Sequence, residues 1–208
     1  MIVMNFPLQG RNVLITGVSR RRGIGYAIAR RFAADGAKIF IQHYRAHDEQ
    51  QQWGGDDLAQ VCAGIRAEQI AGALFGDLSA DLSQPTSAAE LIEVGAEALG
   101  RLDILICNHA RTGQDGSIFD MTAETLDAHW TVNARSPLLL TRYFAEQFAP
   151  REAMRTQPGV QQIRVPQDEF SAGRVIWLTS GQITRPAAGR SLLCGLKICA
   201  GRADGHSS

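Results

Sequence analysis

A glycine-rich turn between an apolar run and an amphipathic run is the feature that most constrains the fold of this chain. Residues 11–16 have the β-branched and apolar composition of a strand, and Gly17 follows them directly. Gly23 and Gly25 stand at the start of residues 24–35, where apolar side chains recur with helical spacing. Glycines suit such a junction because the backbone can turn tightly and approach a pyrophosphate in front of the helix start. The turn therefore predicts a dinucleotide site, and the alternative is a tight loop that binds nothing.

The alternation of apolar and amphipathic segments continues along the chain. It predicts an α/β fold, a Rossmann-type doubly wound parallel sheet in a three-layer α/β/α arrangement. The remaining predicted strands are residues 38–43, 70–75, 102–107 and 174–179, and the remaining predicted helices are residues 56–68, 87–99 and 123–148. Residues 147–172, which contain three prolines, predict a long surface loop. After Gln182 the alternation stops, so we expect a Rossmann domain over residues 1–182, incomplete at its C-terminal edge, and a divergent tail over 183–208.

Composition and charge limit the kinds of partner that this chain is expected to bind. The chain has 208 residues, which suits one domain, and its 21 basic residues balance its 21 acidic ones. A neutral chain gives no reason to expect nucleic acid or an anionic membrane as partner. The apolar runs are too short to span a bilayer and no signal peptide is visible, which predicts a cytoplasmic protein with reduced cysteines. His43 and His47 form the only close histidine pair and lack a third ligand at a familiar spacing, so no metal site is expected.

Around the glycine turn the sequence resembles the short-chain dehydrogenase/reductase family, in particular its 3-oxoacyl-carrier-protein reductase-like branch. The family signature there is TGxxxGxG, and residues 16–25 read TGVSRRRGIG, which is two residues longer in the middle. The resemblance implies a Rossmann fold and a nicotinamide dinucleotide cofactor. The cofactor contacts that it implies in this turn are Gly17, Ser19, Arg20, Gly23, Ile24 and Gly25.

The charge after the second predicted strand bears on which cofactor is used. Members of the family that bind NAD carry an acidic residue at this point, whereas this chain has His43, followed by Tyr44, and no carboxylate before Asp48. Guanidinium groups suit a 2′-phosphate. Those that could reach one here are Arg20, Arg21, Arg22 and Arg45. This pattern favours NADP(H) over NAD(H); the alternative, which we expect for at least two of the four, is an arginine that is only a solvated loop charge.

Further matches extend the resemblance toward the middle of the chain. Asp81 and Leu82 match the pair that contacts the adenine ring in relatives. Residues 105–110 stand where the family has an NNAG stretch after the fourth strand, with Cys107 in place of the first asparagine and Asn108 as the second. The resemblance therefore adds Asp81, Leu82 and Asn108 to the expected cofactor contacts.

The resemblance also implies the chemistry, which is hydride transfer between nicotinamide and the carbonyl or alcohol carbon of a small molecule. Asn133 matches the asparagine that holds a relay water, although it could instead be a polar helix residue facing a neighbour. Ser180, after the fifth predicted strand, matches the serine that binds the substrate oxygen. Lys197 matches the lysine that lowers the pKa of a catalytic tyrosine. Leu193 stands at the position of that tyrosine, and the three tyrosines of the chain lie elsewhere.

Two explanations of the missing tyrosine stay open. Read from the second base of each codon, residues 193–200 can encode Tyr-Val-Ala-Ser-Lys-Ser-Ala-Leu, which contains the family's YxxxK motif. We therefore favour a shifted reading frame, which leaves a truncated and inactive reductase. The alternative is a diverged, catalytically dead module that binds a nucleotide or a partner, and a fragment that binds nothing is a third interpretation. An incomplete sheet would expose an edge, so we expect low stability or self-association as a homo-oligomer.

Overall fold

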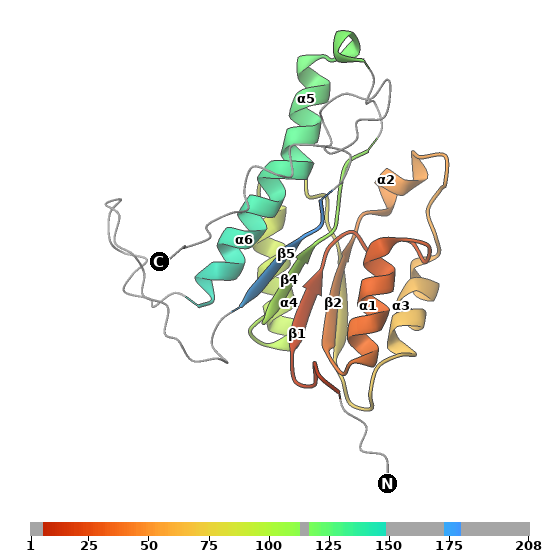
Figure 1. Ribbon diagram of the computed structural model, residues 1–208, viewed down its shortest axis with the longest axis vertical. Coiled ribbons are helices and arrows are strands. Elements are labelled where there is room, and N and C mark those ends of the chain that lie inside the picture. The colour runs from red at the N-terminus through yellow and green to blue at the C-terminus, as the bar shows by residue number, and fades with distance from the viewer. Residues whose placement is uncertain (1–5, 113–116, 149–172, 180–208) are drawn as a thin grey trace, which may run out of the picture.

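A five-stranded parallel sheet forms the centre of the computed structural model, which describes residues 6–112, 117–148 and 173–179. The strand order is β3-β2-β1-β4-β5. The strands are β1 (Asn12–Ile15), β2 (Lys38–His43), β3 (Phe75–Ser79), β4 (Ile104–Cys107) and β5 (Arg174–Trp177). Helices α1 (Ile24–Ala34) and α3 (Leu58–Arg66) cover one face, and α4 (Ser87–Leu99) and α6 (Ser136–Glu146) cover the other (Figure 1). The prediction of a doubly wound, three-layer Rossmann-type fold is confirmed.

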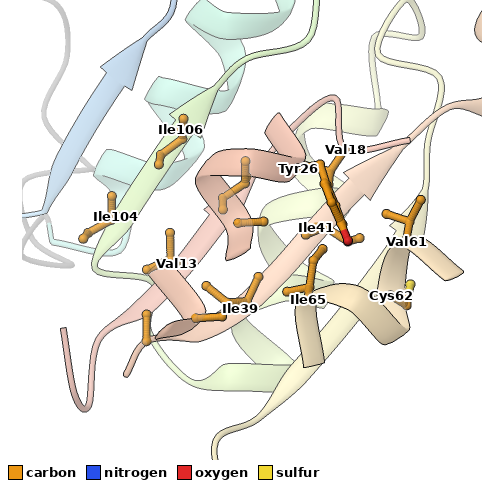
Figure 2. Packing of buried hydrophobic residues seen from close by; sticks show 14 residues of the cluster. Val13, Val18, Tyr26, Ile39, Ile41, Val61, Cys62, Ile65, Ile104 and Ile106 are labelled. Carbon is orange, nitrogen blue, oxygen red and sulfur yellow. The ribbon is translucent and has the colours of Figure 1, made fainter. Parts of the chain in front are cut away.

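The core lies on both faces of the sheet because side chains alternate along each strand. Val13 and Ile15 belong to the same cluster as Val61 and Ile65 of α3. Figure 2 shows this cluster between the sheet and the helices α1 and α3. Leu14, between Val13 and Ile15 in sequence, packs instead on the α4 and α6 side of the sheet. Because β1 is buried on both faces, its apolar residues form a continuous run, as a central parallel strand requires.

Two turn residues explain where the helices of the first half begin and end. Gly36 follows α1 with a φ of +93°, and a Cβ there would lie 2.9 Å from the Cβ of Phe6. Only glycine fits such a left-handed position without strain. Asp57 directly precedes α3. Its carboxylate accepts a hydrogen bond of 2.9 Å from the Ala59 N–H and so caps the start of this helix.

The third strand begins five residues later than predicted. Residues 70–75 have the more apolar composition, but Gly72 adopts a φ of +79° and the chain turns there. The strand begins only at Phe75, which pairs with Ile39, and it continues to Ser79, which pairs with His43. Gly76 and Asp77 are weak strand formers, so pairing with the buried β2 decides the position of β3 against local propensity.

The single helix predicted over residues 123–148 is interrupted. Helix α5 (Ala123–Trp130) runs into a π-helical turn, Thr131–Arg135, and only then into α6. Pro137, in the first turn of α6, has no N–H to donate to the carbonyl of Asn133, and its ring crowds that carbonyl. In the π turn directly before Pro137, the Ser136 N–H bonds to the carbonyl of Thr131, five residues earlier. The remaining helix, α2 (Arg45–Glu49), and the 3₁₀ turn Ile118–Asp120 were not predicted.

Candidate dinucleotide site

A cavity of about 590 Å³ lies next to the ends of β1 and β4, where the strand order reverses. Ligands bind in such crevices at the carboxyl ends of the strands in open parallel sheets. Its lining includes most of the cofactor contacts implied by the sequence: Gly17, Ser19, Arg20, Gly23, Ile24, Asp81, Leu82 and Asn108. Gly25 and Arg45 are not part of the lining.

The glycine turn packs closely against the segment that follows β4. Gly17 has a φ of +71°, and a Cβ there would lie 2.7 Å from the Cα of His109. A Cβ on Gly25 would lie 2.6 Å from Nδ2 of Asn108. The same Nδ2 donates hydrogen bonds to the carbonyls of Thr16 (3.0 Å) and Gly17 (2.9 Å). The turn thus needs its glycines, and Asn108 is the residue that fastens it to β4.

A buried histidine beneath the turn was not singled out from the sequence. His109 Nδ1 lies 2.6 Å from the hydroxyl of Thr16, and Nε2 lies 2.6 Å from the hydroxyl of Ser136. Ser136 donates its proton to the carbonyl of Val132 at 2.9 Å, so it accepts the Nε2–H of His109. The Thr16 hydroxyl also lies 3.2 Å from the carbonyl of Ile106. The network ties the end of β1 to the start of α6.

Opposite the glycine turn, the unpredicted helix α2 places a buried carboxylate in the cavity wall. Asp48 is 7% exposed and accepts hydrogen bonds from the hydroxyl of Ser19 and, at 3.3 Å, from Nε1 of Trp53. Nε of Arg20 lies 3.4 Å from Oδ1 of the same carboxylate, and the Arg20 guanidinium lies 4.8 Å from the centre of the Trp53 ring. The carboxylate therefore connects the glycine turn to α2 and to the segment after it.

The other three arginines considered for a 2′-phosphate do not share the contacts of Arg20. Arg22 lines the cavity. Arg45 pairs with Glu49 one helical turn away at 2.8 Å, and both side chains are about half exposed. Arg21 pairs with Asp56 at 3.8 Å. Of the four, only Arg20 and Arg22 belong to the cavity wall, in keeping with the expectation that at least two are loop charges.

Three titratable groups of the cavity wall have shifted pKa values. The charge of Asp81, followed by burial, raises the pKa of Tyr44. Burial raises the pKa of Asp81, but hydrogen bonds from Ser83, Gln84 and Tyr44 outweigh it and hold the value below the ordinary one. Burial also lowers the pKa of His47, which is therefore neutral at pH 7. The lining thus combines the cations Arg20, Arg22 and Arg111 with the anions Asp48 and Asp81.

Asn133, the only proposed catalytic residue within the described part of the chain, is buried in the π turn. Its Oδ1 accepts a 2.7 Å hydrogen bond from the N–H of Arg111, and its Nδ2 donates to the carbonyl of Arg111 at 3.1 Å. The side chain thus faces a neighbouring backbone, which was one of the two interpretations of this residue. It fixes the backbone of Arg111, a residue that lines the cavity.

Several predictions concern residues outside the described ranges. Ser180, Leu193 and Lys197 lie there, as do the tail over 183–208 and nearly all of the predicted loop over 147–172. Among the residues that the structure describes, no three His, Cys, Asp or Glu side chains are arranged to hold a metal ion. No helix within the same ranges is long and apolar enough to cross a membrane.

Sheet order, glycine turn and cavity together place the chain in the Rossmann class of folds. A family model described as Enoyl-(Acyl carrier protein) reductase matches residues 17–157. The chain belongs to the short-chain dehydrogenase/reductase family.

Individual relatives agree with this assignment. An uncharacterized oxidoreductase of Bacillus subtilis is 30% identical over 87% of this chain and 61% of its own length. A short-chain dehydrogenase from Burkholderia cenocepacia in complex with NADP has a TM-score of 0.65 at 28% identity, over 91% of this chain and 62% of that one. A 3-oxoacyl (acyl-carrier-protein) reductase from Agrobacterium tumefaciens with NADP bound has a TM-score of 0.66 at 26% identity. The match covers 93% of this chain and 61% of that one. The chain thus spans about three-fifths of the length of these relatives.

Proposed function

We propose that this chain is the cofactor-binding part of an oxidoreductase that uses NADP(H) in preference to NAD(H) and acts on a small carbonyl or alcohol. The observation that carries the proposal is the cavity at the reversal of strand order, with the glycine turn in its wall. The cavity volume of about 590 Å³ lies within the range that is usual for small-molecule and cofactor sites. The NADP complexes of the Burkholderia and Agrobacterium relatives support the choice of cofactor class.

The residues of the cavity fit a dinucleotide. Gly17 and Gly25 leave no space for a Cβ, so the backbone itself forms the wall beside Gly23 and Ile24. The first N–H groups of α1 have no partner within the helix and suit a pyrophosphate. Asp81 and Leu82 would contact the adenine, and Arg20 and Arg22 supply the positive charge that favours a 2′-phosphate.

The bound cofactor would supply a hydride, and the chain would position the substrate and its proton. In this assignment Ser180 binds the substrate oxygen and Lys197 supplies a positive charge, whereas the side chain of Asn133 supports the site by fixing the backbone of Arg111. Leu193 cannot donate a proton, so we propose little or no turnover by this chain. A shifted reading frame remains our explanation, and it fails if the actual codons for residues 193–194 give no tyrosine in the shifted frame.

Leu193 also favours a second candidate, a nucleotide-binding module without catalysis. Titration of the purified chain with NADPH, followed by NADPH oxidation with a panel of small aldehydes and ketones, separates the possibilities. Our proposal expects saturable binding with negligible oxidation, together with coding DNA that restores a tyrosine. Binding without oxidation and without such DNA would favour the second candidate. Absence of binding would refute both.

A further inference from the structure

Gln42 is a polar residue near the carboxyl end of β2 that belongs to the cavity wall and is only 2% exposed. Phe40 and Ile41, which precede it, are apolar, as a strand buried on both faces requires. A buried amide costs free energy unless both its oxygen and its nitrogen find hydrogen-bond partners. The role of this side chain therefore follows from the partners that it has.

The two ends of the Gln42 amide are bonded to main-chain atoms of two different segments. The Gly17 N–H donates a hydrogen bond of 2.9 Å to Oε1 of Gln42. Nε2 of Gln42 donates one of 2.7 Å to the carbonyl of Ala80. Only one orientation of the amide satisfies both bonds, because the oxygen cannot donate and the nitrogen cannot accept. The side chain thus bridges the glycine turn and the segment after β3.

The two bridged segments form the two halves of the proposed nucleotide site. The glycine turn leads from Gly17 to the start of α1, where we assign the pyrophosphate. Ala80 directly precedes Asp81 and Leu82, where we assign the adenine. The strands before these segments, β1 and β3, are separated in the sheet by β2. Gln42 lies on β2 and bonds to both sides, so it sits where the spacing between the two halves is set.

We infer that Gln42 is a positioning residue that holds the two halves of the nucleotide site at the separation a dinucleotide requires. This inference rests on the proposed function, because it assigns the pyrophosphate to one bridged segment and the adenine to the other. A ligand that spans both halves gains from a fixed separation, since binding of one end brings the other end to its partners. A ligand that occupies one half gains little from it.

Ligands of different reach provide the test. ADP spans both halves, whereas adenosine and inorganic pyrophosphate each occupy one. ADP is titrated into the wild-type chain and into Gln42→Met by calorimetry, and the two fragments are titrated by NMR. Methionine keeps the length of the side chain and removes both hydrogen bonds. We expect the affinity for ADP to fall about tenfold, and the affinity for each fragment to fall less than about twofold.

Gln147→Met is the matched control. Oε1 of Gln147 accepts a hydrogen bond of 3.0 Å from the Leu102 N–H, and its Nε2 donates one of 3.1 Å to the carbonyl of Phe144. The same kind of bridge thus lies at the amino end of β4, and none of these residues lines the cavity. This variant should lose stability in urea unfolding, while the ratio of the ADP affinity to the fragment affinities keeps its wild-type value.

Hydrogen exchange in the wild-type chain provides a second test if Gln42→Met fails to fold. Adenosine bound beside Asp81 does not reach the glycine turn, so it can slow exchange of the Gly17 N–H only through the protein. We expect adenosine alone to slow this exchange. An exchange rate of Gly17 that adenosine leaves unchanged would overturn the inference.

Three outcomes of the titrations bear on the inference and on the proposed function separately. Equal losses of affinity for ADP and for the fragments in Gln42→Met would overturn the inference, since they would show that Gln42 only supports the fold. Absence of ADP binding to the wild-type chain would overturn it as well. If the excess loss for ADP appears but neither NADPH nor NADH binds, the inference holds for a nucleotide site and the oxidoreductase assignment falls.

Discussion

Two walls of the same cavity hold their shape by different means. The backbone wall (Gly17, Asn108 and His109) is fixed by contacts to main-chain atoms at the ends of β1 and β4. The charged wall (Arg20, His47, Asp48 and Trp53) is held by side chains from the glycine turn, α2 and the segment after α2. Substitutions in the backbone wall should therefore cost both stability and binding, whereas those in the charged wall should change which nucleotide binds.

The largest effect is expected from Gly17→Ala. Alanine at a φ of +71° is strained, and its Cβ would lie 2.7 Å from the backbone of His109, which cannot move without displacing β4. We expect a loss of about 3 kcal/mol or more in the free energy of unfolding and loss of NADPH binding, measured by urea titration and by calorimetry.

Gly72→Ala is the matched control for this substitution. Gly72 has a similar φ of +79°, but a Cβ there would meet nothing within 4 Å. The strain alone should cost about 1 kcal/mol and leave NADPH binding intact. If the two variants lose the same stability and bind alike, close packing does not define the backbone wall.

The next largest effect is expected from Asn108→Ala. It removes both hydrogen bonds that fasten the carbonyls of Thr16 and Gly17. We expect a loss of about 2 kcal/mol in the free energy of unfolding and at least tenfold weaker NADPH binding. Asn12→Ala is the control, because Asn12 donates a 2.8 Å bond to the carbonyl of Arg101 at the opposite end of β1. Its loss should lower stability without weakening binding, and equal binding losses would contradict the comparison.

The same contrast explains how much could be predicted from the sequence. Helix α4 was predicted with its observed bounds because apolar periodicity is local. Gly17 was expected at the cavity because of the backbone demands of the turn, and Asn108 was expected there only from the family resemblance. The position of β3 was wrong since pairing with β2 outweighs the weak strand propensity of Gly76. The charged wall was only partly foreseen: Asp48 was noted as the first carboxylate after β2, but its pairing with Arg20 depends on α2.

His109 shows a different limit of the sequence. Its position after β4 was clear, but its role depends on Ser136, which lies 27 residues later and directly follows the π turn. The pattern of residues 123–148 predicts a regular helix, and no spacing rule marks the interruption beyond the presence of Pro137. The roles of Ser180 and Lys197 remain predictions from the resemblance.

A smaller effect is expected from Ser136→Ala, which tests the support beneath the backbone wall. The substitution leaves the Nε2–H of His109 buried without the hydroxyl that accepts it. We expect a loss of about 1 to 2 kcal/mol in the free energy of unfolding and a smaller loss of binding than for Asn108→Ala. Ser117→Ala is the control at an exposed 3₁₀ turn, and it should change the free energy of unfolding and the NADPH affinity by much less. No loss of stability for Ser136→Ala would show that His109 finds another partner.

The smallest effect is expected from pH, through His47 in the charged wall. Burial lowers its pKa below the unfolded value, with Arg111 and Arg20 adding to the shift while Asp48 and Asp81 oppose it. As pH falls through the unfolded value of about 6.5, the unfolded chain takes up the proton first, so this contribution to stability declines and then levels off. A bound phosphate should instead favour the protonated imidazole, so NADPH affinity should rise over the same range. His47→Gln should flatten both profiles in urea unfolding and calorimetric titrations, and a change in stability without a change in affinity would place His47 outside the nucleotide's reach.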